Sequence, residues 1–168
     1  DRNQLIAGKE SSYVQYVHVP GDSHSLMDNI IYDIEEDLDG TIYIGGRSGL
    51  SILDRRRPGG FLNIYPGRDE ASIPFNEVNT LLRTRDESIL IGTMGGGLCR
   101  LDIPSRTGIE FIGMDSVRQL YQTSSVRSIY AENENELWLS LYAYGVVKYD
   151  RRNDNVFSCR NLECFKDC

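Results

Sequence analysis

The stretch that decides the fold is IYDIEEDLDGTIYIGGRSGLSILD, residues 31–54. It holds three short runs typical of β-strands, and the first two are separated by the polar turn Asp37–Gly40, whose Asp-Gly pair supplies the positive φ of a tight hairpin. The same pattern returns as VNTLLRTRDESILIGTMGGGLCRLD at 78–102 and as VRSIYAENENELWLSLYAYGVVKYD at 126–150. The starting positions differ by 47 and then 48 residues. The sequence therefore predicts three copies of one structural unit.

Each copy predicts three strands, at 31–35, 41–45 and 49–53, at 78–82, 89–92 and 97–101, and at 126–130, 137–140 and 145–149. A weaker fourth strand follows each copy, at 61–65, 109–113 and 156–159, and one more strand precedes the first copy, at 13–19. The second strands carry continuous apolar triplets, such as Ile-Tyr-Ile at 42–44 and Leu-Trp-Leu at 137–139. We expect such strands to be covered on both faces.

Four strands in about 48 residues, with inner strands covered on both faces, are typical of β-propeller blades. We predict an all-β propeller segment of three four-stranded antiparallel blades plus one extra N-terminal strand. Gly45 and Gly92 would let adjacent sheets approach closely. The chain then forms a single segment, with an orphan outer strand and linker at 1–24, blades at 25–66, 73–114 and 122–160, and a tail at 161–168.

Three blades cannot close a ring, because closed propellers use roughly four to eight. Two faces with apolar triplets would stay bare, and leaving several hundred Å² of apolar surface exposed forgoes on the order of 10 kcal/mol per face. We therefore expect self-association, for example two chains that pool their blades, or blades that this sequence lacks.

Composition excludes several classes of function. The chain has 168 residues, and 18 basic against 25 acidic side chains give a formal net charge of −7. An acidic chain is a poor nucleic-acid binder, because phosphate neutralisation needs a basic face. No apolar run approaches 18 residues, so we expect no membrane-spanning segment.

The residues predict no catalytic site, metal site or cofactor. His18 and His24 are the only histidines, and neither has further metal ligands at a convincing spacing. The glycine-rich stretches at 46–49 and 95–97 are interpreted as hairpin turns, since they lack the features of a nucleophile elbow or a phosphate loop.

Two further residue groups have structural interpretations. Asp54, Asp102 and Asp150 end the third strand of each copy, where an Asx-turn is favoured over a calcium site. Cys99 is interpreted as a small core residue. Cys159, Cys164 and Cys168 allow either a terminal disulfide or free thiols.

Topology supplies the candidate ligand-binding residues. In a propeller, the loop entering the first strand and the loop between the second and third strands lie on one face. From these loops we select exposed aromatic rings, which stack on sugars or partner side chains, and polar or flexible groups beside them. The candidates are Arg47, Asn76, Met94, Tyr142 and Tyr144.

The repeat itself resembles a known family. The phrases EDLDGTIYIGG at 36–46 and ILIGT at 89–93, followed by Gly-Gly-Leu at 96–98, are similar to two-component regulator propeller repeats. The third copy has Ser140 in place of the glycine. The resemblance covers roughly residues 13–160. It implies the periplasmic sensor region of a hybrid histidine kinase, non-catalytic in itself, with oligosaccharide breakdown products as ligands.

Two other functions stay open. The segment could be a propeller scaffold for protein–protein contact or dimerisation without a small ligand, or a propeller enzyme such as a lyase. Binding of an oligosaccharide would favour the sensor over the scaffold. Loss of an activity on mutation of a histidine or an acidic pair would be needed to support the lyase.

Overall fold

The computed structural model describes residues 13–56, 59–67, 72–102, 109–111 and 125–158. These residues form three four-stranded antiparallel sheets, in each of which the strands follow one another in chain order. Sheet 1 contains β1 (Ile31–Glu36), β2 (Ile42–Gly46), β3 (Gly49–Leu53) and β4 (Leu62–Ile64). Sheet 2 contains β5 (Val78–Arg83), β6 (Ser88–Thr93), β7 (Leu98–Asp102) and β8 (Ile109–Phe111). Sheet 3 contains β9 (Val126–Ala131), β10 (Glu136–Leu141), β11 (Gly145–Asp150) and β12 (Asn155–Ser158).

The predicted strands of all three copies are confirmed, with ends that differ by one or two residues. The polar turns are confirmed as well. The buried Asp37 carboxylate accepts hydrogen bonds from the backbone N–H groups of Asp39 and Thr41, both at 2.9 Å, and from the Tyr43 hydroxyl at 3.1 Å. Gly40 closes this turn with a φ of 80°. The turn therefore satisfies its own backbone donors and fixes the hairpin register.

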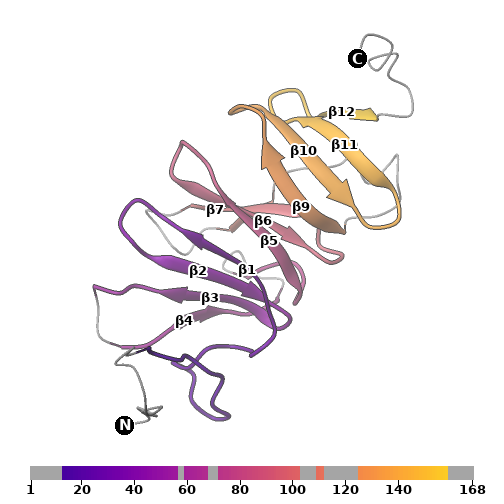
Figure 1. Cartoon of the computed structure of the whole chain (residues 1–168). Helices are drawn as coiled ribbons and strands as arrows, with labels where there is room; N and C mark the ends of the chain where they lie inside the picture. Colours follow the sequence, from indigo (N-terminus) through magenta and orange to yellow (C-terminus); the bar gives the residue numbers. More distant parts are fainter. Residues whose placement is uncertain (1–12, 57–58, 68–71, 103–108, 112–124, 159–168) are drawn as a thin grey trace, which may run out of the picture.

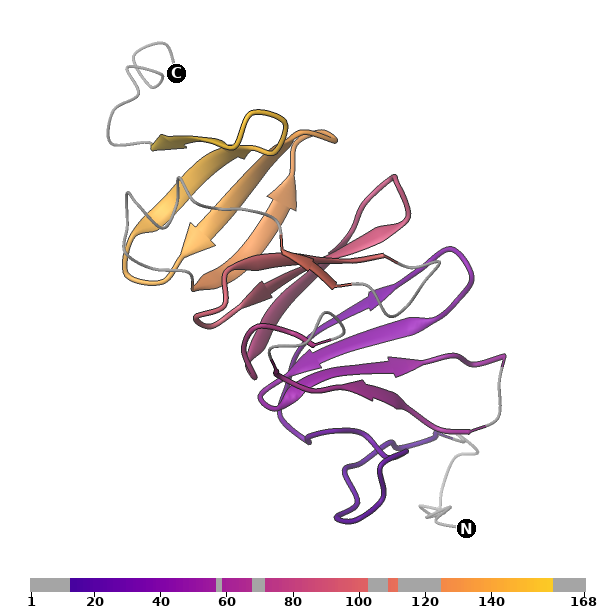
Figure 2. The same ribbon diagram turned by 180° about the vertical axis from the view of Figure 1, so that it is seen from behind.

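The three sheets stack face to face, with the first strands β1, β5 and β9 next to one another (Figures 1 and 2). One apolar cluster joins sheets 1 and 2, and it includes Tyr43, Leu50 and Ile91. A second cluster joins sheets 2 and 3, and it includes Leu90 and Leu139. The core thus consists of two layers between sheets, and sheet 2 contributes one of its faces to each layer.

The glycines permit the close approach of the sheets that the sequence predicts. A Cβ on Gly45 would lie 2.6 Å from Cγ1 of Val78 in sheet 2, and a Cβ on Gly92 would lie 2.9 Å from Cγ1 of Val126 in sheet 3. Real side chains do not come this close. Each glycine therefore sets the distance to the next sheet.

Two expectations need correction. Burial of the second strand on both faces holds only for sheet 2, where Ile89, Leu90 and Ile91 are all fully buried. In sheets 1 and 3 the second strand, β2 or β10, buries only one of its faces. Ile44 and Trp138 lie on the other face and are half-buried. The reason is that the described residues place no further sheet against the outer faces of sheets 1 and 3.

The predicted extra strand at 13–19 is wrong, because the structure has no strand there. Two backbone N–H groups of this segment donate to side chains instead of to a neighbouring strand. The His18 N–H donates to Oδ1 of Asn29 at 2.8 Å, and the Val19 N–H donates to Oγ of Ser25 at 2.9 Å. The chain that follows packs on β3 and β4 of sheet 1: the N–H of Met27 donates to Oγ of Ser51 at 3.1 Å, and Nδ2 of Asn63 donates to the Ser25 carbonyl at 2.9 Å. Tyr16 packs edge-on against Phe61, just before β4.

Several predictions lie outside the described residues. They concern residues 1–12, the loop before Ser125, the cysteines at 159, 164 and 168, and the tail at 161–168. In the described part of the chain the structure contains no helix that could cross a membrane.

Candidate functional site

The candidate loops lie along one edge of the stack, which we call the loop edge. The same backbone hydrogen bond joins the two loop sets in each repeat, so the second hairpin turn is fixed to the segment that enters the first strand. The bonds run from the N–H of Arg47 to the carbonyl of Ile30 at 3.1 Å, from Met94 to Glu77 at 2.9 Å, and from Tyr142 to Ser125 at 3.1 Å. The repeat therefore gives all three turns the same orientation.

At the junction of sheets 1 and 2, the loop edge is organised by Asp28. Its carboxylate accepts hydrogen bonds from Oγ of Ser48 at 2.6 Å, from Nε of Arg47 at 3.2 Å and from the N–H of Ile30 at 2.9 Å. The Ser48 hydrogen bond is the main reason why the pKa of Asp28 lies below its ordinary value. Asn76 donates from Nδ2 to the Arg47 carbonyl at 3.1 Å. Arg47 and Asn76 are thus brought together, and one guanidinium nitrogen already has a partner.

A cavity of about 330 Å³ lies beside this junction. Ser48 and Asn76 line it together with His18, whose Nδ1 lies 2.9 Å from the Leu26 carbonyl. The described residues hold no group of three or more His, Cys, Asp or Glu side chains that could bind a metal ion. The chemistry available here is hydrogen bonding to polar groups of a ligand.

The remaining candidates lie farther along the edge. Met94 is half-buried and its sulfur lies 4.0 Å from Nδ2 of Asn79, so it also packs against its own sheet. Tyr142 and Tyr144, in the β10–β11 turn of sheet 3, expose 53% and 44% of their surface. The Arg127 guanidinium lies 5.3 Å from the centre of the Tyr142 ring. The structure therefore brings Arg47 together with Asn76, places Tyr142 and Tyr144 in one turn of sheet 3, and places Met94 in the β6–β7 turn of sheet 2.

The Asx-turn interpretation is confirmed for Asp54 and Asp150 and the core interpretation for Cys99, while the turn after Asp102 lies outside the described residues. Oδ1 of Asp54 accepts from the N–H of Arg56 at 3.0 Å, and Oδ1 of Asp150 accepts from the N–H of Arg152 at 2.9 Å, so both form Asx-turns. Cys99 is fully buried in the core, and burial raises the pKa of its thiol to about 12.

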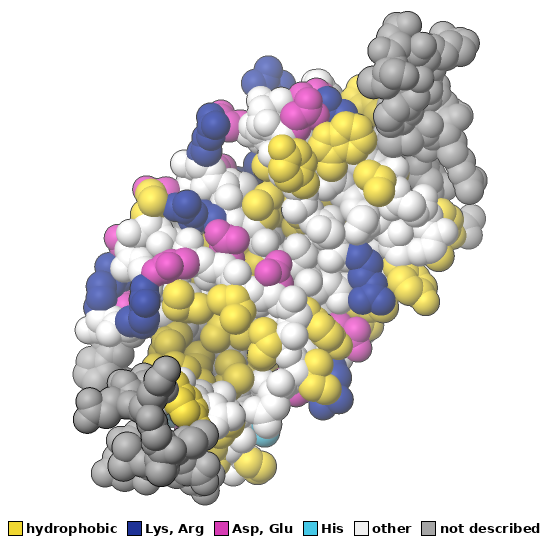
Figure 3. Space-filling model, in the orientation of Figure 1, with side chains coloured by type: hydrophobic (Ala, Val, Ile, Leu, Met, Phe, Trp, Pro, Cys, Tyr) yellow, Lys and Arg dark blue, Asp and Glu magenta, His cyan; other side chains and the backbone are white. Residues whose placement is uncertain are grey.

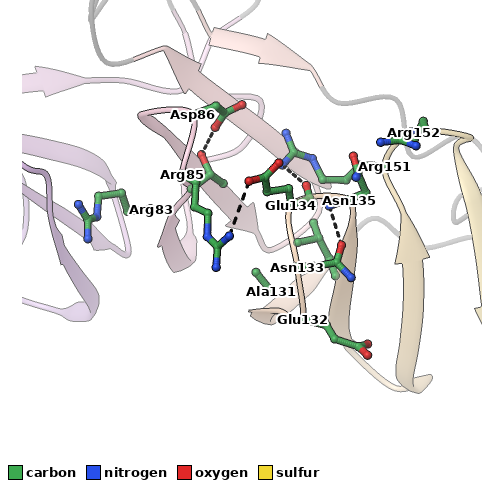
Figure 4. A pocket seen from close by; sticks show the side chains of 12 residues that line it. Arg83, Arg85, Asp86, Ala131, Glu132, Asn133, Glu134, Asn135, Arg151 and Arg152 are labelled. Atoms are coloured by element: carbon green, nitrogen blue, oxygen red, sulfur yellow. Dashed lines mark hydrogen bonds and ion pairs between the residues drawn. The ribbon is translucent and has the colours of Figure 1, made fainter.

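A second cavity, which the sequence did not predict, lies on the opposite edge of the stack. Its volume is about 580 Å³, and it lies between the β5–β6 turn of sheet 2 and the β9–β10 and β11–β12 turns of sheet 3 (Figure 4). Charged side chains gather along this edge (Figure 3). The cavity's charged lining residues are Arg83, Arg85, Asp86, Glu132, Glu134, Arg151 and Arg152. The sequence feature that could have pointed to this cavity is the Asp-Arg-Arg run at the end of the third strand, at 54–56 in the first copy and 150–152 in the third.

Comparison with known proteins identifies a fold similarity. No protein-family model and no curated protein matches the chain. Among solved structures, the chain is similar to the extracellular domain of BT3049 from B. thetaiotaomicron, described as a candidate hybrid two-component system. The TM-score is 0.67 and the sequence identity 19%, over 86% of this chain and 20% of that one. Two structures of the extracellular domain of BT4673 from the same organism match with TM-scores of 0.41 and 0.46, at 15% and 16% identity. They cover 84% and 89% of this chain, and each match spans 28% of the other chain. The chain thus shares its fold with about a fifth of the BT3049 domain.

Proposed function

We propose that the chain is a non-catalytic segment of a periplasmic sensor in a hybrid two-component system, and that its three sheets are consecutive blades of a β-propeller. The observation that carries this proposal is the stack of three repeated four-stranded sheets, which has the fold of part of the BT3049 extracellular domain. The parent protein would be a sensor histidine kinase. A histidine-kinase region in the coding sequence downstream would support the proposal, and an unrelated enzyme domain there would contradict it.

The proposed ligands are oligosaccharide breakdown products bound at the loop edge. Sugar rings stack on aromatic faces and bond to amide and guanidinium groups. Tyr142 and Tyr144 present exposed rings, and Arg47 and Asn76 supply polar groups on turns that are fixed to their sheets. No metal or cofactor is needed for this binding. Signalling requires that the ligand bind one arrangement of the sensor more tightly than the other.

Calorimetric titration with a panel of neutral oligosaccharides tests the ligand. We expect saturable binding of at least one oligosaccharide, and about a tenfold loss or more in the Tyr142→Ala variant, because burial of a large apolar side chain contributes about 1.5–3 kcal/mol. Tyr130→Ala is the matched control, since Tyr130 is also an exposed tyrosine of sheet 3 but lies in β9, outside the β10–β11 turn. If no oligosaccharide of the panel binds, the ligand assignment is wrong.

A second function, protein–protein contact or self-association, is favoured by the outer faces of sheets 1 and 3. In sheet 3, the strand register places Tyr130, Trp138, Lys148 and Phe157 in one row across all four strands. Tyr130 is 66% exposed, and in sheet 1 Ile34 is 59% exposed. Hydrophobic side chains are visible over both sheets in Figure 3. Exposed apolar faces of this kind mark contact surfaces.

Sedimentation velocity at micromolar concentration tests self-association. We expect a species larger than the monomer, and we expect Tyr130→Glu to dissociate it by placing a charge on the outer face of sheet 3. Leu38→Glu is the control, because Leu38 is 73% exposed in a turn. A strictly monomeric wild-type chain with a sharp melting transition would exclude self-association through these faces.

A further inference from the structure

The larger cavity, between the turns of sheets 2 and 3, brings together three arginines from two sheets. Arg85 comes from the β5–β6 turn, and Arg151 and Arg152 come from the β11–β12 turn (Figure 4). Two other charged lining residues interact with residues outside the cavity lining. Arg83 lies 4.0 Å from Glu35 of sheet 1, and Glu132 lies 2.8 Å from Nζ of Lys148. The three arginines, Asp86 and Glu134 remain, and of these Asp86 also lies 4.0 Å from Nη1 of Arg100, which is outside the cavity lining.

Sheet 1 contains the same arginine pair with carboxylate partners, and it provides an internal comparison. Arg55 forms an ion pair with Glu36, and Arg56 pairs with Asp39 at 3.0 Å and with Asp54 at 3.1 Å. Repeat spacing places Ala131 of sheet 3 at the position of Glu36. The replacement removes the carboxylate that would otherwise pair with the first arginine, and its small side chain lines the cavity.

The arginines of sheet 3 are consequently left with few partners. Arg151 donates from Nη1 to the Glu134 carbonyl at 3.1 Å, and its N–H donates to the Asn135 carbonyl at 2.8 Å. These bonds hold the β11–β12 turn against the β9–β10 turn. Within the described ranges, no carboxylate lies at ion-pair distance from Arg151 or Arg152. Both guanidinium groups therefore keep donors available for a ligand.

The two acidic groups at the cavity, Asp86 and Glu134, neutralise the three arginines only in part. The hydroxyls of Thr84 and Ser88 both donate to Oδ1 of Asp86, and these hydrogen bonds hold its pKa below the ordinary value. Oδ2 of Asp86 lies 4.0 Å from Nη1 of Arg100, so Asp86 is shared between Arg100 and the charge of Arg151. Glu134 lies 3.7 Å from Arg85, with both side chains largely exposed. Exposed ion pairs contribute little, so a ligand anion can take the place of Glu134.

We propose that this cavity binds a small oxyanionic ligand, whose carboxylate or sulfate groups are held by Arg85, Arg151 and Arg152. The planar guanidinium group forms paired, charge-assisted hydrogen bonds with such groups. A volume of about 580 Å³ suits a small molecule. This site lies on the edge opposite the loop edge and does not depend on the proposed oligosaccharide site.

The test is an NMR titration of the whole chain with sulfate and, separately, with succinate, at an ionic strength held constant with sodium chloride. We expect saturable shifts at the arginine side chains. Arg152→Ala and Arg85→Gln should each weaken binding about tenfold or more, as for loss of a charged hydrogen bond. Glu134→Gln should tighten binding severalfold, because it removes the competing carboxylate. Preference for one probe would identify the group that is recognised.

Arg56→Ala is the matched control, since it removes the corresponding arginine of sheet 1 and should leave the affinity unchanged. Unfolding midpoints confirm that each variant is folded. The proposal is overturned if neither probe shows saturable binding, if Arg56→Ala weakens binding as much as Arg152→Ala does, or if Glu134→Gln fails to tighten it.

Discussion

Replacement of Gly92 by alanine tests whether glycine sets the spacing between sheets 2 and 3. A Cβ at this position would lie 2.6 Å from Cγ2 of Thr80 and 2.9 Å from Cγ1 of Val126. Overpacking of this kind costs about 1–3 kcal/mol. In a strand, alanine alone would be favoured over glycine by about 0.5–1 kcal/mol. We therefore expect a net loss of roughly 1–2 kcal/mol of unfolding free energy.

Urea denaturation and thermal melting measure this loss, which corresponds to about 2–4 °C in Tm for each kcal/mol in a chain of this size. Ser140→Ala is the matched control. Ser140 occupies the same position in sheet 3, but it lies on the outer face and already carries a Cβ. Its substitution should change stability by less than about 0.5 kcal/mol. A Gly92→Ala variant as stable as the wild type would refute the close-approach explanation.

Three more predictions concern single side chains. Asp37→Ala should cost about 2–3 kcal/mol of unfolding free energy, since two backbone donors and the Tyr43 hydroxyl lose their acceptor. The control is Asp39→Ala, which removes only an exposed ion pair and should cost less than about 1 kcal/mol in the same urea denaturation experiment. Because the folded-state pKa of Asp28 lies below the ordinary value of 3.8, its contribution to stability is complete above that pH and is lost as the pH falls through the folded pKa. Asp28→Asn should therefore flatten the acid limb of a stability-against-pH curve, and an unchanged limb would contradict this. Cys99, whose thiol pKa is raised to about 12 by burial, should resist alkylation at pH 8 until the chain unfolds, as peptide mapping by mass spectrometry can show.

The strands could be predicted from the sequence because local and tertiary signals agree. The Asp-Gly and Asn-rich turns fix the hairpins, and the repeat confirms each assignment three times. The segment at 13–19 was predicted wrongly because its apolar residues, such as Tyr16, also suit a surface segment that packs over a sheet. A strand needs a partner ladder, and composition alone does not reveal whether one exists.

The loop edge could be predicted from topology, but the cavity between sheets 2 and 3 could not. Its arginines lie about 65 residues apart along the chain, and they meet only because adjacent sheets pack with their turns side by side. The decisive feature is that sheet 3 has Ala131 at the repeat position where sheet 1 has Glu36. Sheet 3 therefore lacks the carboxylate that pairs with the first arginine in sheet 1. Such a difference has meaning only once the structure shows that Arg55 pairs with Glu36 in the first repeat.

Comparison of equivalent positions also bears on what covers sheet 3. Gly45 faces Val78 and Gly92 faces Val126, and in both pairs the glycine admits a β-branched side chain from the next sheet. Ile31 is the equivalent of these valines in sheet 1, and Ser140 is the equivalent of the glycines in sheet 3. If sheet 1 of a second copy docked on sheet 3 with the same packing, a larger β-branched residue would meet a position that already carries a side chain. A partner that covers sheet 3 must therefore either lie at a greater distance from it than adjacent sheets of this chain lie from each other, or carry a smaller residue opposite Ser140.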